Sequence, residues 1–272
     1  QNFMDAGQYR DAYREYLSII NRDAAYKDCP ERMAVAREMG TFVVAIMPIE
    51  GNIRSRNLKT KLEAYTLNSL TGLQNPFLKI VDRQHLDDIL EQQNISLSGL
   101  ISDADVLEVG NLTGAEALLI GQVMDYREEE GDLQQEIKRG YESYTVKEKG
   151  EDGKEVERTR YRPVKYYEFR KRNKVYLSFN VKLLHLETSE VLFSEVVERE
   201  MNDDVHWVTY KGNASRLFPE REDKPYLRRS AVNELRSLTS ARKEPTSIGE
   251  LTDRTFGKVG DAIAYKVDDY LQ

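Results

Sequence analysis

Short apolar runs alternate with helical segments in the first half of this chain. The run FVVAIMPI at residues 42–49 is followed by Gly51 and Asn52, which is typical of a strand buried on both faces that ends in a loop. Further apolar runs at residues 77–81 and 114–126 are separated from it by segments with leucine at helical spacing. Strands that alternate with helices predict a parallel α/β sheet with right-handed crossovers.

The second half of the chain predicts antiparallel strands and a final helix. Residues 175–183 alternate apolar with polar side chains, and a second strand is expected at residues 191–197. The tight link ETSE between them indicates a hairpin with one solvated face. The sequence SIGE at residues 247–250 is a capping box that opens a helix. One face of this helix should carry Phe256, Val259, Ile263, Val267 and Tyr270. The expected fold class is therefore α/β, with a mixed sheet flanked by helices.

Residues 1–39 are expected to form a helical segment in front of the α/β domain, which we assign to residues 40–272. Apolar side chains recur at helical spacing from Tyr9 onward. The order Gly-x-Tyr-x-x-Ala that starts at Gly7 resembles the turn and second helix of a tetratricopeptide repeat. An ordinary amphipathic helix packed on the next domain explains the same pattern.

A long charged insertion is expected at residues 127–172, and a loop-rich segment at residues 201–245 contains the only tryptophan. The insertion begins acidic, ends basic, and contains Asp152-Gly153, a dipeptide typical of hairpin turns. We expect a projecting β-hairpin whose arms attract each other by charge. Tyrosine and arginine supply much of the energy of protein interfaces. The candidate partner contacts are Tyr161, Tyr166, Tyr167, Phe169 and Trp207. A solvated hairpin with a purely structural role is the alternative.

The sequence offers no recognisable catalytic, metal-binding or cofactor-binding motif. One cysteine and three histidines, without ligand spacing, argue against a zinc site. The net charge of −7 argues against nucleic acid as the main partner. Asp82 and Arg83 could form a catalytic pair or cap a helix. We favour the cap, because Asp82 can accept the free N–H groups of a helix that begins near Gln84. We therefore expect no enzyme activity, no metal and no cofactor.

The segment IVDRQHLDDILEQQ, with LSGLISDADVLEVGNLTGAEALLIGQVMDYR after it, resembles the CsgG family, the curli secretion channel and its relatives. The shared pattern is a strand that ends in an acid-Arg pair, a helix, a glycine turn, a helix that ends at Gly-Ala, and an apolar strand with an internal glycine. The matching positions are Asp82, Arg83, Leu86, Ile89, Leu90, Gln93, Gly99, Leu100, Gly110, Gly114, Ala115, Leu119 and Gly121. Residues 180–195 are similar to a later strand pair of the family, with Ser189 where glycine is usual.

The resemblance implies a non-enzymatic envelope protein on the periplasmic side of the outer membrane, with a tendency to form homo-oligomeric rings. It also implies a lipid anchor upstream of residue 1, so that this chain itself does not enter the membrane. Channel members of the family insert two β-hairpins per subunit. A membrane strand needs apolar side chains at alternate positions, and neither residues 161–173 nor residues 192–202 supply them. We therefore expect a scaffold that binds other envelope proteins. The alternatives are a curli-type secretion channel subunit and a lipoprotein regulator of cell-wall synthesis.

Overall fold

The computed structural model describes residues 2–51, 53, 55–81, 114–149 and 155–271. Asp82, Arg83, the helices expected after them and the turn at Asp152-Gly153 lie outside the described residues. Contacts divide the chain into two compact units. Unit 1 comprises residues 1–127, 176–199 and 253–272, and unit 2 comprises residues 128–175 and 200–252.

The strands belong to one mixed sheet. They are β1 (Phe42–Ile46), β2 (Glu50–Gly51), β3 (Leu78–Val81), β4 (Ala117–Glu130), β5 (Gln134–Lys149), β6 (Glu155–His185), β7 (Val191–Thr209), β8 (Leu217–Arg221) and β9 (Lys224–Pro225). In the described part of the chain this nine-stranded sheet has the order β3-β1-β4-β6-β5-β8-β9, with β2 also on β4 and β7 also on β6. β1 is parallel to β3 and β4, whereas β5 and β6 are antiparallel. The predicted fold class, an α/β protein with a mixed sheet flanked by helices, is confirmed.

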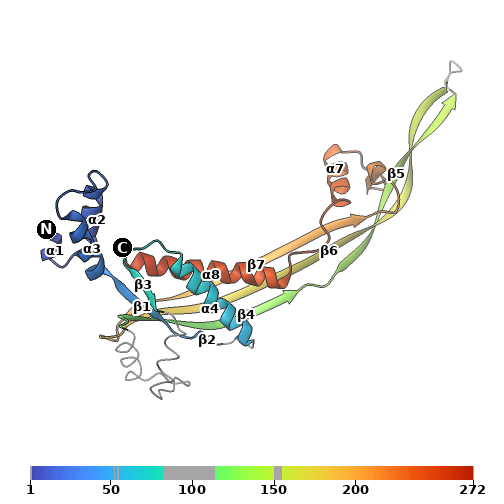
Figure 1. The fold of residues 1–272 in the computed structure, drawn as a ribbon. Helices are drawn as coiled ribbons and strands as arrows, with labels where there is room; N and C mark the ends of the chain where they lie inside the picture. Colours follow the sequence, from blue (N-terminus) through green and yellow to red (C-terminus); the bar gives the residue numbers. More distant parts are fainter. Residues whose placement is uncertain (1, 52, 54, 82–113, 150–154, 272) are drawn as a thin grey trace. The chain divides into compact units, whose positions relative to one another are not determined.

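The helices are α1 (Asn2–Asp5), α2 (Tyr9–Ile20), α3 (Cys29–Gly40), α4 (Arg56–Thr71), α7 (Arg229–Leu238) and α8 (Ile248–Leu271), with a 3-10 turn η1 (Ala214–Arg216). In unit 1, α4 and α8 lie on the same side of the sheet (Figure 1). The predicted capping box opens α8, since the Oγ of Ser247 accepts a hydrogen bond from the backbone N–H of Glu250 at 3.2 Å. Ser55 precedes α4 as expected, but its side chain makes no capping hydrogen bond.

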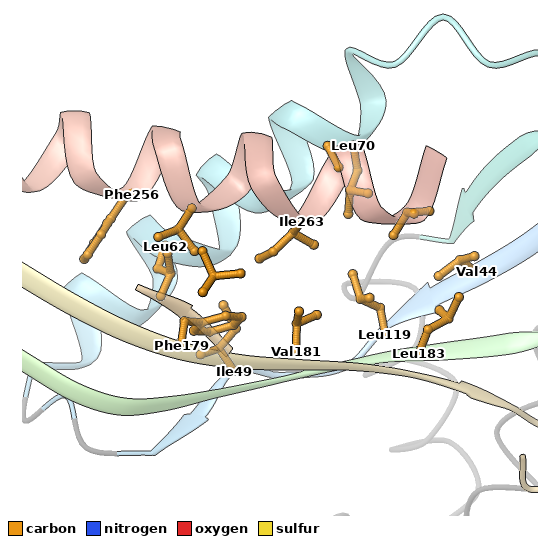
Figure 2. Close-up of a cluster of buried hydrophobic side chains, with 14 of the residues drawn as sticks. Val44, Ile49, Leu62, Leu70, Leu119, Phe179, Val181, Leu183, Phe256 and Ile263 are labelled. Atoms are coloured by element: carbon orange, nitrogen blue, oxygen red, sulfur yellow. The ribbon is translucent and has the colours of Figure 1, made fainter. Parts of the chain in front are cut away.

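The core of unit 1 lies between these two helices and the sheet. Figure 2 shows Leu62 and Leu70 of α4 and Phe256 and Ile263 of α8 among buried side chains of the strands. The strands contribute Val44, Leu119, Phe179, Val181 and Leu183. Val44 and its neighbour Ala45 are both fully buried, although successive side chains of a strand point to opposite faces. This double burial explains why residues 42–49 form a continuous apolar run.

The predicted apolar face of α8 is right at four positions and wrong at the last. Phe256, Val259, Ile263 and Val267 are fully buried. Tyr270 is 40% exposed, and Leu271 is buried in its place at 1% exposure. The next buried side chain after Val267 is therefore at a spacing of four residues rather than the predicted three, and both spacings occur on one face of a helix.

The N-terminal helices form a small cluster of their own in unit 1. Ala12 and Tyr16 of α2 are buried together with Cys29 and Ala36 of α3. The guanidinium of Arg10 donates hydrogen bonds to the backbone oxygens of Gly40 and Leu271, which fixes α2 to the end of α8. The tetratricopeptide resemblance of this segment stays a prediction.

Residues 201–209 differ from the expected loop, because β7 continues through them. They alternate between more and less exposed positions, with Val205 and Trp207 buried. Asp203 occupies one of the less exposed positions of this strand. A charged side chain there hides the apolar alternation from which a strand is recognised.

Candidate partner-binding surface

Most of the candidate contact residues lie on the ladder of β5 with β6 in unit 2. The two strands pair without interruption from Gln134 opposite Arg170 to Lys149 opposite Glu155. Directly opposed residues in an antiparallel pair share a face, and the side-chain period is two. Odd-numbered residues of both strands therefore form one face of the ladder, and even-numbered residues form the other.

The even-numbered face holds unit 2 together. Tyr166 is buried there against Val208, Leu217 and Leu235. Burial raises the pKa of Tyr166 to about 12. This packing gives Tyr166 a structural role and removes it from the surface that a partner could touch.

A buried carboxylate on the same face is neutralised by its neighbour. Arg162 donates hydrogen bonds from Nε and Nη2 to Oε2 of Glu142, at 2.9 and 2.5 Å. These bonds hold the pKa of Glu142 below its usual value. The pair satisfies a charge that would otherwise be costly to bury.

The odd-numbered face presents three of the candidate residues together. The rings of Phe169 and Trp207 stack with centroids 5.1 Å apart and planes 10° apart. Tyr167 follows with its ring centroid 6.4 Å from that of Phe169. Ile137 lies opposite Tyr167 in the ladder and is 56% exposed. We call Ile137, Tyr167, Phe169 and Trp207 the aromatic strip.

Trp207 is buried, so it does not contribute to the part of the aromatic strip that a partner could touch. Its side chain is only 7% exposed, whereas Tyr167 and Phe169 are partly exposed and Ile137 is mostly so. A partner would therefore touch Ile137, Tyr167 and Phe169, while the buried ring of Trp207 stacks on Phe169.

Tyr161 is on the same face but not in the aromatic strip. It is six residues from Tyr167 along a strand, which is about 20 Å. Its ring packs edge-on against Phe218 of β8, with centroids 5.2 Å apart. The guanidinium of Arg236 lies 4.9 Å from the centroid of the same Phe218 ring. Tyr161 thus helps to attach β8 and α7 to the ladder.

A hydrogen-bond network fixes the strand that carries Trp207. Asp203 of β7 accepts hydrogen bonds from Nη2 of Arg242 at 2.7 Å and from the backbone N–H and Oγ1 of Thr246, both at 2.6 Å. The bonds from Arg242 and Thr246 hold the pKa of Asp203 far below its usual value. The carboxylate stays charged and ties β7 to residues 242–246.

The described residues contain no group of three or more His, Cys, Asp and Glu side chains that could hold a metal ion. No helix within the described ranges is long and apolar enough to cross a membrane. Asp82 and Arg83, which we expect to cap a helix, lie outside the described residues.

The mixed sheet with its covering helices defines an α/β protein. The family model described as curli production assembly/transport component CsgG matches residues 50–132. The resemblance to the CsgG family is therefore confirmed over this part of the chain. A comparison with curated proteins gives no match.

The chain is also similar to several solved structures. The hypothetical protein CT253 from Chlamydia trachomatis has 14% identity and a TM-score of 0.37, with 85% of this chain and 98% of that chain covered. Lipoprotein GNA1162 from Neisseria meningitidis has 11% identity and a TM-score of 0.35, with 59% and 83% covered. The PelC dodecamer from Paraburkholderia phytofirmans has 11% identity and a TM-score of 0.32, with 83% and 89% covered.

Proposed function

We propose that this chain is a non-enzymatic assembly or scaffold protein of the cell envelope, which binds partner proteins through the aromatic strip. The observation that carries the proposal is the exposure of Ile137 beside Tyr167 and Phe169 on one face of the β5–β6 ladder. Burying an isoleucine side chain contributes about 1.5–3 kcal/mol. Tyrosine is enriched among the residues that dominate interface energies.

The family match supports the cellular setting of this proposal. The matched family is described as an assembly/transport component for curli production. We place the protein at the periplasmic face of the outer membrane, where its partners would be other envelope proteins and further copies of this chain. Both faces of the β5–β6 ladder carry charged side chains, such as Lys138 and Glu168 on one face and Arg139 and Lys165 on the other. These charges support a scaffold over the alternative of a secretion channel subunit.

The test uses single positions, because β6 is continuous from the ladder into unit 1 and a deletion of residues 127–172 would cut it. A photo-crosslinking amino acid is placed at Ile137 in cells that make the protein, and adducts are identified by mass spectrometry. The control position is Tyr144, which is 39% exposed on the opposite face of the same ladder.

We expect position 137 to give a discrete adduct with one envelope protein, and position 144 not to give this adduct. The absence of any adduct at position 137, or the same adducts at both positions, would overturn the proposal.

A further inference from the structure

The outer edge of β6 is open from Glu155 to Pro163. On one side β6 pairs with β5 as far as Glu155. On its other side β7 ends at Thr209, and close to that end His206 contacts Glu168 at 2.8 Å. Within the described residues, no strand pairs with this outer side between Glu155 and Pro163. An open edge presents backbone donors and acceptors that another strand can use.

Two backbone contacts of β6 show which residues face this edge. The N–H of His185 donates to the oxygen of Glu190 at the start of the β7 side. The oxygen of Arg172 accepts from the N–H of Gly131 on the other side. Backbone groups of successive residues in a strand point to opposite sides, so the odd-numbered residues of β6 face outward.

Proline at position 163 agrees with this assignment. Pro163 has no backbone N–H, and proline within a sheet belongs where the missing donor would have faced solvent. Glu157, Thr159 and Tyr161 then present complete backbone donors and acceptors along the open edge.

The side chains beside this edge are basic. Arg158, Arg160 and Arg162 are at every second position, so they share the even-numbered face of the ladder. Residues 142–149 and 155–165 contain six lysines and arginines against four glutamates, in a chain with a net charge of −7. Arg160 is bonded to Glu148 at 2.5 Å, and Arg162 is bonded to Glu142. A guanidinium has five N–H donors, however, and the three arginine side chains are mostly exposed.

The same charges exclude a second copy of this edge as the partner. Two copies that paired antiparallel about a two-fold axis would place like charges opposite each other in every register centred between Glu155 and Tyr161. Depending on the register, these are glutamates at 155 and 157 or arginines at 158, 160 and 162. Like charges in directly opposed positions destabilise a strand pair.

We infer that the outer edge of β6, from Glu155 to Pro163, binds an extended segment of a partner protein as an added strand, with acidic side chains at every second position. Backbone hydrogen bonds provide affinity in this mode, and alternate side chains provide specificity. The acidic side chains of the partner lie opposite Arg158, Arg160 and Arg162. This surface is distinct from the aromatic strip, which is on the odd-numbered face, so the two can be tested separately.

The experiment measures binding of synthetic peptides to the purified full chain by fluorescence anisotropy. The first peptide alternates Glu with Val, the second alternates Lys with Val, and the third is the Glu-Val peptide with N-methylated backbone at alternate residues. We expect saturable binding of the Glu-Val peptide. The Lys-Val peptide and the N-methylated peptide should each bind at least about tenfold more weakly. The variant R158Q/R160Q should bind the Glu-Val peptide at least about tenfold more weakly than the wild type does. The variant I137S should bind this peptide with the affinity of the wild type.

A lack of saturable binding of the Glu-Val peptide would overturn the inference. Equal binding of the N-methylated peptide would also overturn it, because the contact would then be charge attraction without an added strand. Loss of binding in I137S would assign the peptide to the aromatic strip instead.

Discussion

The rings of Phe169 on β6 and Trp207 on β7 stack almost in parallel, with their centroids 5.1 Å apart. Trp207 is only 7% exposed, so a buried ring packs against the partly exposed ring of Phe169. Replacing Trp207 by alanine should lower the free energy of unfolding by about 3–5 kcal/mol. Replacing Ile137 by alanine should change it by less than about 0.5 kcal/mol. Urea denaturation of both variants measures these changes. Equal losses of unfolding free energy in the two variants would contradict a structural role for Trp207 and a surface role for Ile137.

Gly260 permits the close packing of α8 on α4. A Cβ atom at this position would lie 2.8 Å from Oγ of Ser69 and 2.9 Å from the backbone oxygen of Tyr65. Gly260→Ala should therefore destabilise unit 1 by about 1–3 kcal/mol. Gly249 of the same helix has nothing within 4 Å of such an atom. Gly249→Ala should be neutral or stabilise by up to about 1 kcal/mol, since alanine favours helix. Thermal denaturation that ranks the two variants in the reverse order would contradict this account.

The buried phenol of Tyr166 should make the protein sensitive to alkali. Burial raises the pKa of Tyr166 from 10.0 to about 12. The unfolded chain therefore ionises first as the pH rises. The contribution of the neutral phenol to stability is complete below pH 10 and is lost between pH 10 and 12, by roughly 3 kcal/mol. Tyr166→Phe should remove this part of the pH dependence, whereas Tyr144→Phe, at an exposed position, should retain it. Urea denaturation across this pH range measures the difference, and identical curves for the two variants would rule out the assignment.

Asp203 should make the stability of the protein sensitive to acid, as Tyr166 makes it sensitive to alkali. Its hydrogen bonds from Arg242 and Thr246 hold its pKa well below the usual value of 3.8. Its contribution to stability is therefore complete above about pH 4 and declines as the pH falls through the lower pKa of the folded state. Asp203→Asn should be less stable at neutral pH and should lose less on acidification than the wild type.

The neighbouring Asp204, which is mostly exposed, offers a matched control for this experiment. Asp204→Asn should follow the wild-type acid curve. If Asp203→Asn also followed the wild-type acid curve, the carboxylate would not be the group that ties β7 to residues 242–246.

The sheet of unit 1 could be predicted from the sequence because its strands have simple burial patterns. Val44 and Ala45 are buried on opposite faces, which gives a continuous apolar run, and residues 175–183 alternate because one face of β6 is buried. The end of β7 could not be predicted in this way. Asp203 is tolerated there only through Arg242 and Thr246, which lie about forty residues further along the chain.

The aromatic strip could be predicted only in part. Aromatic content pointed to Tyr167, Phe169 and Trp207, but not to Ile137. A two-residue turn at Asp152-Gly153 would shift the ladder by one residue and place Ile137 opposite Glu168. The observed ladder places Ile137 opposite Tyr167. A shift of one residue exchanges the two faces, so the face that carries the aromatic strip is defined only once the register is known.

Binding through the aromatic strip is tested by the dissociation constant between this chain and the partner captured at position 137. It is measured for the wild type, for the double variant I137S/Y167S, and for Y144S as the control on the opposite face. Circular dichroism establishes that each variant is folded. We predict that I137S/Y167S binds at least about tenfold more weakly than the wild type, while Y144S binds equally well. Wild-type affinity in the folded I137S/Y167S protein would contradict the account.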